Sequence, residues 1–194
     1  MASIDASTSG AGGIITTADN TGTLNLQSGG TTIATINSTG LSMASGKVLA
    51  PTGPAFSAYI SSTNQVLGSG TWTKIALNAE EFDTNNNFDT TNYRFTPTVA
   101  GYYMISAVGW VNSPGTNPSY VTTAIYKNGT AIKQADLYGG ANVNGAVTVT
   151  SVIYLNGSTD YIEFYMYAAG GNAGQYTYAG SANTYMSGFL ARSA

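Results

Sequence analysis

The chain contains no cysteine and no histidine. Without cysteine, disulfide bonds and thiolate chemistry are excluded, and without either residue type the usual zinc and iron sites cannot be built. A serine–histidine–aspartate triad is excluded for the same reason. The only catalytic chemistry left open is that of paired carboxylates.

Charge is also scarce, because charged residues make up 8% of the 194 residues and the net charge is −3. The basic residues are scattered along the chain: Lys47, Lys74, Arg94, Lys127, Lys133 and Arg192. No basic stripe is available to neutralise phosphates, so we expect no nucleic-acid binding. No apolar run approaches the roughly 18 residues that span a membrane, and the N-terminus lacks the basic and apolar regions of a conventional signal peptide. We therefore expect no membrane insertion.

Aromatic residues are absent from the N-terminal quarter. Residues 1–50 hold none, whereas residues 56–194 hold every Trp, Tyr and Phe of the chain. The sequence A-P-T-G-P over Ala50–Pro54 lies at this change, and Pro and Gly are typical of boundaries. We therefore expect an N-terminal segment over residues 1–54 and a head domain over residues 55–194.

The N-terminal segment carries short apolar pairs between Gly-containing turns. The pairs are Ile14-Ile15, Leu24 with Leu26, Ile33 with Ile36, Leu41 with Met43, and Val48-Leu49. Leu24-Asn25-Leu26 and Leu41-Ser42-Met43 alternate as half-buried strands do. These side chains are too few to form a core, so the pattern predicts short strands that become ordered only in an assembly. A flexible leader is the alternative.

The head domain is predicted to consist of strands. Val, Ile, Thr, Tyr and Phe dominate nine segments: Phe56–Ser61, Trp72–Leu77, Tyr93–Thr98, Tyr102–Val111, Tyr120–Tyr126, Thr130–Tyr138, Val147–Asn156, Asp160–Ala169 and Asn183–Arg192. Asn128-Gly129 and Asn156-Gly157 are hairpin signals. No segment keeps a helical period. The pattern predicts an all-β, antiparallel sandwich or jelly roll.

Two motifs carry a resemblance to a known family. The segment Phe82–Ile105 reads FDTNNNFDTTNYRFTPTVAGYYMI, and a terminal strand reads Tyr185-Met186-Ser187-Gly188-Phe189-Leu190. Both resemble the globular head of complement subcomponent q, whose jelly roll is shared with tumour necrosis factor, over roughly residues 55–192. The resemblance implies heads that pack as threefold bundles. The N-terminal segment resembles pieces of bacteriophage tail and head fibres.

The resemblance implies a homotrimeric virion fibre protein that attaches to a host surface through its head. Residues 1–54 would bind other virion proteins. The protein would be made in the host cytoplasm and would act on the extracellular particle, without being an enzyme. Two alternatives stay open: a capsid-decorating head fibre without a receptor role, and a polysaccharide-degrading tailspike. Against the tailspike, Glu80 and Glu81 point to opposite faces of an extended chain, which suits them poorly as a catalytic pair.

Two sets of residues are candidates for binding. Loops rich in Gly, Asn and Tyr suit a host-surface glycan, and the candidate contacts are Tyr138, Asn142, Asn172, Gln175, Tyr176 and Tyr178. An acidic cluster offers oxygen ligands of the kind that calcium takes, with Glu81, Asp83 and Asp89 as candidates. No other cofactor is expected.

Overall fold

The computed structural model describes residues 22–38, 40–45, 53–140, 143–172 and 174–194. The chain divides into two compact units, Met1–Pro51 and Thr52–Ala194. The described residues form strands, turns and irregular segments without any helix. It follows that no helix among them could cross a membrane.

The first unit contains a small antiparallel sheet of three consecutive strands, β1 (Leu24–Ser28), β2 (Thr31–Asn37) and β3 (Gly40–Met43). The turn between β1 and β2 has positive φ at both Gly29 and Gly30, as a tight hairpin requires. Apolar side chains on these strands lie 39–54% exposed: Leu24, Leu26, Ile36 and Leu41. Ala34 is the one buried residue of this sheet, which therefore has no core of its own within the described residues. The pairs Ile14-Ile15 and Val48-Leu49 lie outside those residues.

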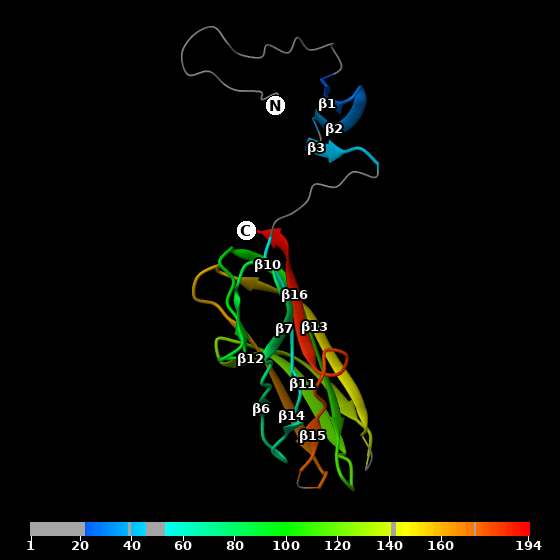
Figure 1. The fold of residues 1–194 in the computed structure, drawn as a ribbon, viewed down its shortest axis with the longest axis vertical. Coiled ribbons are helices and arrows are strands. Elements are labelled where there is room, and N and C mark those ends of the chain that lie inside the picture. Colours follow the sequence, from blue (N-terminus) through cyan, green and yellow to red (C-terminus); the bar gives the residue numbers. More distant parts are fainter. Residues whose placement is uncertain (1–21, 39, 46–52, 141–142, 173) are drawn as a thin grey trace. The chain divides into compact units, whose positions relative to one another are not determined.

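The second unit, called the head below, consists of two sheets. The first sheet has the order β13-β10-β16-β4-β7; the short β15 pairs with the last two residues of β10, and β5 pairs with β15. Its strands are β4 (Ala55–Tyr59), β5 (Gln65–Val66), β7 (Ala79–Asp83), β10 (Gly101–Asn112), β13 (Gly145–Leu155), β15 (Tyr176–Thr177) and β16 (Tyr185–Ser193). The long strands run side by side along the head (Figure 1).

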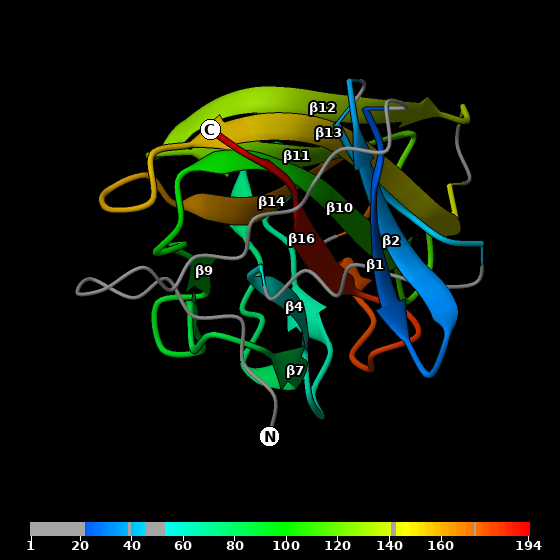
Figure 2. The same ribbon diagram turned by 90° about the horizontal axis from the view of Figure 1, so that it is seen from above.

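The second sheet has the order β12-β11-β14-β9-β8, and β6 also pairs with β14. Its strands are β6 (Thr73–Lys74), β8 (Phe88–Asp89), β9 (Arg94–Phe95), β11 (Tyr120–Lys127), β12 (Thr130–Tyr138) and β14 (Ile162–Ala169). β12 of this sheet and β13 of the first sheet lie next to each other at one edge of the head (Figure 2). The named strands pair antiparallel throughout, so the all-β, antiparallel fold class expected from the sequence is confirmed.

Alternating side chains fill the space between the two sheets. On β14 the side chains of Phe164, Met166 and Ala168 are fully buried, whereas the residues between them lie on the opposite face. Four rings of the core form one aromatic cluster: Phe56 stacks on Phe95 at 4.2 Å and on Phe88 at 5.3 Å, and Tyr103 meets Phe95 edge-on.

The Tyr103 hydroxyl lies within this core and donates a hydrogen bond of 2.7 Å to the Val99 carbonyl. Burial raises the pKa of Tyr103 to about 12. Its neighbour Tyr102 points outward, as the alternation of this strand predicts.

Of the two expected hairpins, one is confirmed and the other is wrong. Asn128 and Gly129 both have positive φ and join β11 to β12 as a two-residue hairpin. At Asn156-Gly157 the chain instead passes between sheets, because β13 pairs with β10 and β14 pairs with β11. The Asn156 side chain accepts hydrogen bonds from the amides of Ser158, Thr159 and Asp160, which closes a local turn.

Strand lengths differ from expectation at the edges of the sheets. The segments expected around Trp72–Leu77 and Tyr93–Thr98 contain only the two-residue β6 and β9. Conversely, the acidic stretch Ala79–Asp83 forms β7, an edge strand that the sequence did not predict. All residues of β7 are exposed or half-buried, so this strand lacks the apolar alternation that would have identified it.

Candidate functional site

The outer face of the first sheet exposes an unusual amount of apolar surface. Six large side chains on this sheet lie 38–52% exposed: Phe82, Tyr102, Trp110, Val152, Tyr154 and Phe189. β4, β10 and β13 contain no charged residue. A contiguous apolar surface of this kind is typical of interaction sites.

The strand register arranges this face in bands. Met104 is paired with Val152 on one side and with Phe189 on the other, which makes an apolar band across three strands. In the neighbouring band Ser106 lies between Thr150 and Ser187, and the Thr150 hydroxyl donates a hydrogen bond of 3.0 Å to that of Ser106. On this face a band of small polar side chains therefore lies next to the apolar band.

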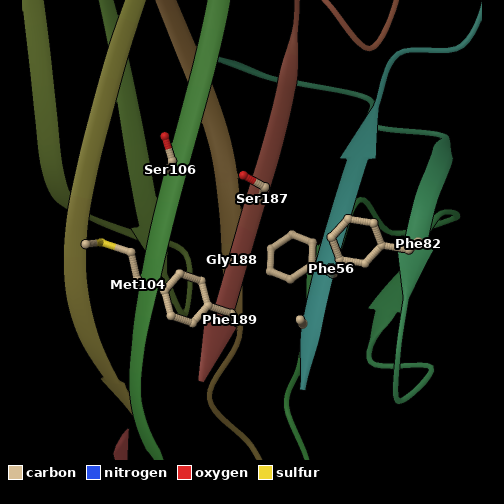
Figure 3. A pocket seen from close by; sticks show the side chains of 8 residues that line it. Phe56, Phe82, Met104, Ser106, Ser187, Gly188 and Phe189 are labelled. Carbon is tan, nitrogen blue, oxygen red and sulfur yellow. The ribbon is translucent and has the colours of Figure 1, made fainter. Parts of the chain in front are cut away.

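A shallow hollow of about 220 Å³ lies on this face (Figure 3). It is lined by Ala55, Phe56, Phe82, Met104, Ser106, Ser187, Gly188 and Phe189. Gly188 lies opposite Phe56 on the adjacent strand, and a side chain at Gly188 would come within 2.5 Å of Ile105. The hollow could accommodate an apolar side chain from another molecule.

A second hollow of about 310 Å³ lies at the end of β10, lined by Trp110, Asn112, Asn144, Tyr178 and Asn183. The Trp110 indole donates a hydrogen bond of 3.1 Å to the Asn144 side chain, and the Asn112 amide donates one of 2.6 Å to the Tyr178 hydroxyl. The rings of Trp110 and Tyr178 meet edge-on, 6.2 Å apart. We call this site the end hollow; its rings and amides can pack against and hydrogen-bond a sugar.

Tyr176 extends the hydrogen-bond network of the end hollow. Its hydroxyl lies 3.5 Å from that of Tyr178, to which it donates. This donation raises the pKa of Tyr176, and the hydrogen bonds received from Tyr176 and Asn112 lower the pKa of Tyr178. Both hydroxyls are thereby oriented before any ligand arrives.

The structure separates the candidate glycan residues. Tyr178 lines the end hollow and Tyr176 adjoins it, but Tyr138 lies on the second sheet. Gln175 is fully buried, with its amide donating to the Ala168 carbonyl, so its observed role is in holding the loop. Asn172 is exposed, and its backbone amide bonds to Thr116. Asn142 lies outside the described residues.

Sequence reasoning missed the other residues of the end hollow, which are Trp110, Asn112, Asn144 and Asn183. The outward position of Trp110 could have been predicted, because Trp110 and the outward-facing Tyr102 are an even number of positions apart on β10 and so lie on the same face. The asparagines come from three separate segments, and only the fold brings them together.

The candidate calcium ligands are engaged in their own loops. Asp83 accepts hydrogen bonds from the amides of Asn85 and Phe88, and Asp89 accepts from the amides of Thr91 and Asn92. Glu81 accepts from the Ser57 hydroxyl. Within the described residues no group of three or more acidic side chains is placed to hold a metal ion. The geometry therefore gives no support to a calcium site here.

The Asp160 carboxylate has partners on both of its oxygens. It forms an ion pair with Lys127 at 2.8 Å and accepts hydrogen bonds from the Asn128 side chain and the Asn156 amide. The hydrogen bonds from Lys127 and then Asn128 lower the pKa of Asp160 below its ordinary value of 3.8. The charged form is thus favoured in the folded state.

We expect Asp160→Asn to lower the free energy of unfolding at pH 7 by about 1–3 kcal/mol, the usual worth of hydrogen bonds to a charged group. Because the folded state lowers this pKa, the advantage of the wild type is present above pH 3.8 and is lost as pH falls through the lower folded value. Urea unfolding at fixed protein concentration, at pH 7 and below pH 3, measures the difference. Asp136→Asn, at an exposed site on β12, is the control. A difference that did not change with pH would contradict this account.

Comparisons with known proteins place the fold. No protein-family model matches the chain, and no curated protein matches it. Among solved structures, the head is similar to the globular domain of zebrafish complement 1qA protein, with a TM-score of 0.54 and 16% identity over 73% of this chain and 99% of that one. It is also similar to Eiger TNF from S. frugiperda, with a TM-score of 0.57 and 7% identity over 73% and 94%. These likenesses confirm the predicted jelly roll.

Proposed function

We propose that the chain is a homotrimeric, non-enzymatic fibre protein of a virus particle, which attaches to a host surface through its head. The observation that carries this proposal is the exposed apolar surface on the outer face of the first sheet. Full burial of a large apolar side chain is worth about 1.5–3 kcal/mol, and six such side chains stay substantially exposed on this face. Self-association would bury them.

Three copies around one axis suit the chemistry of this face. A threefold axis brings identical side chains together, so like charges near it would repel. β4, β10 and β13, which supply much of the face, carry no charge. The similarity of the head to the complement and tumour-necrosis-factor jelly rolls is consistent with the same arrangement.

The N-terminal unit supports the fibre part of the proposal. Its three strands expose Leu24, Leu26, Ile36 and Leu41 and bury almost nothing within the described residues. Association with the same unit in other copies, or with other virion proteins, would cover these side chains. A receptor-binding head joined to such a segment is the organisation of a fibre that acts on the particle outside the cell.

The proposed receptor is a host-surface glycan. The end hollow combines two aromatic rings with three asparagine side chains, and charge is scarce around it. A polysaccharide-degrading tailspike is less favoured, because the Glu81 carboxylate is already held by a hydrogen bond from the Ser57 hydroxyl. Release of reducing sugar from a host polysaccharide, lost on Glu80→Gln, would revive that candidate.

Immunogold electron microscopy of virus particles from cells that express the chain tests the proposal, with an antibody against residues 53–194. We expect gold at the ends of tail or fibre structures. Gold spread over the capsid would favour a capsid-decorating head fibre instead. Particles without any gold, together with abundant protein elsewhere in the cells, would refute the virion role.

A further inference from the structure

The outer face of the second sheet carries a continuous row of aromatic rings. Each ring contacts the next, with centroid distances of 6.0, 5.9, 5.5, 5.8 and 4.0 Å. In this order the six residues, called the aromatic row below, are Tyr138, Tyr120, Tyr167, Trp72, Tyr126 and Tyr165. They come from β12, β11, β14 and the residue before β6.

Strand alternation places these rings on the side away from the core. On β14 the residues Phe164 and Met166 are buried between the sheets, so Tyr165 and Tyr167 lie on the other face. Between the rings the sheet carries the small residues Thr122 and Ala124, which are almost completely covered. The rings therefore form a layer over a floor of small side chains.

Shielding the small residues of the sheet from water does not explain why all six rings are present. Trp72 and Tyr138 remain 40% and 78% exposed, and Tyr138 lies at the end of the row. Within the described part of the chain, none of the five tyrosine hydroxyls donates or accepts a hydrogen bond, so they remain free for a ligand. Burial raises the pKa of Tyr126 and of Tyr165 above the ordinary value of 10.0, so both hydroxyls stay protonated as donors well above neutral pH.

The charge around the row indicates an uncharged ligand. The rings themselves are neutral, and the adjacent Lys74 and Glu163 neutralise each other in an ion pair. The exposed carboxylate of Asp136, in register with Thr122 on the same face, would repel an anionic ligand. Among the described residues, this face offers no cluster of unpaired cations that could neutralise a nucleic acid or another strongly acidic polymer. An uncharged sugar chain matches instead, since its C–H faces pack on rings and its hydroxyls bond to phenols.

We propose that the aromatic row is a binding surface for an extended, uncharged polysaccharide. Rings 4.0–6.0 Å apart can contact several sugars of one chain in succession, so weak contacts add along the strand. The inference rests on the proposed attachment role and adds to the end hollow a second sugar-binding surface, on the other sheet. The row lies on the opposite sheet from the apolar face, so trimer formation would leave it accessible.

Native gel electrophoresis of the full chain in gels containing dextran, xylan, mannan or hydroxyethyl cellulose tests the proposal, with heparin as the charged comparison. We expect at least one neutral polymer to retard the wild-type protein. Trp72→Ala and Tyr138→Ala should each weaken this binding about ten-fold, as losing a stacking ring does. Trp72→Phe keeps a ring and should retain most of it.

Leu137→Ala is the matched control, because Leu137 neighbours Tyr138 but lies on the other face of β12. Circular dichroism and solution mass confirm that each variant folds and assembles. Retardation by heparin alone, or by no neutral polymer, would overturn the proposal. Loss on Tyr178→Ala with full binding by Trp72→Ala would also overturn it, assigning the sugar to the end hollow and leaving the attachment role intact.

Discussion

A Val152→Asp variant is expected to be monomeric under conditions where the wild type is trimeric. Val152 lies half exposed in the apolar band beside Met104, on the face that we propose to be the subunit interface. Association would bury an unpaired carboxylate in each subunit, at a cost of about 3–5 kcal/mol per subunit. Each 1.4 kcal/mol is a factor of ten in the equilibrium constant, so three carboxylates should abolish the trimer at micromolar concentration.

Sedimentation velocity on the purified variant measures this effect. Ile132→Asp is the matched control, since Ile132 is also an exposed aliphatic residue on a strand, but on the second sheet. The control should sediment as the wild type does. If Val152→Asp remained trimeric with an unchanged circular dichroism spectrum, the outer face of the first sheet would not be the interface.

The largest loss of stability is expected for Phe95→Ala. Phe95 is fully buried, stacks on Phe56 and contacts Tyr103 edge-on, so the substitution leaves a cavity at the centre of the aromatic core. Removing a buried Phe side chain costs about 3–5 kcal/mol. Urea unfolding at a fixed protomer concentration measures the change, because association adds to apparent stability.

Val66→Ala provides the comparison for the core substitution. Val66 lies on β5 and is largely exposed, so its truncation should change the free energy of unfolding by less than about 0.5 kcal/mol. Equal losses for the two variants would mean that the four-ring cluster does not dominate the core.

Much of the head could be predicted because its long strands alternate. The segment Tyr102–Val111 was expected to be a strand because of its aromatic and β-branched residues, and β10 covers it with inward and outward side chains in turn. The hairpin at Asn128-Gly129 was predictable from the dipeptide alone, since few other dipeptides adopt positive φ at both residues. The edge strand β7 was not, because its pairing with β4 depends on a contact across the fold.

The candidate sites were less accessible to sequence reasoning. Tyr138 and Tyr178 were both identified as candidate glycan contacts, but the sequence could not show that Tyr138 lies on the second sheet and Tyr178 in the end hollow. Gln175 lies in a segment whose composition is typical of a recognition loop, yet tertiary packing buries its side chain completely. The aromatic row depends on the register between β11 and β14, which places Thr122 beside Tyr167 and Ala124 beside Tyr165. Register of this kind follows from long-range pairing.

The mass of the intact chain in solution tests the central claim most directly. Sedimentation equilibrium at micromolar concentration should give one species of three times the 20.0 kDa chain mass. A single species at 20.0 kDa would contradict the account, because the apolar face of the first sheet would then remain exposed to water in the free protein.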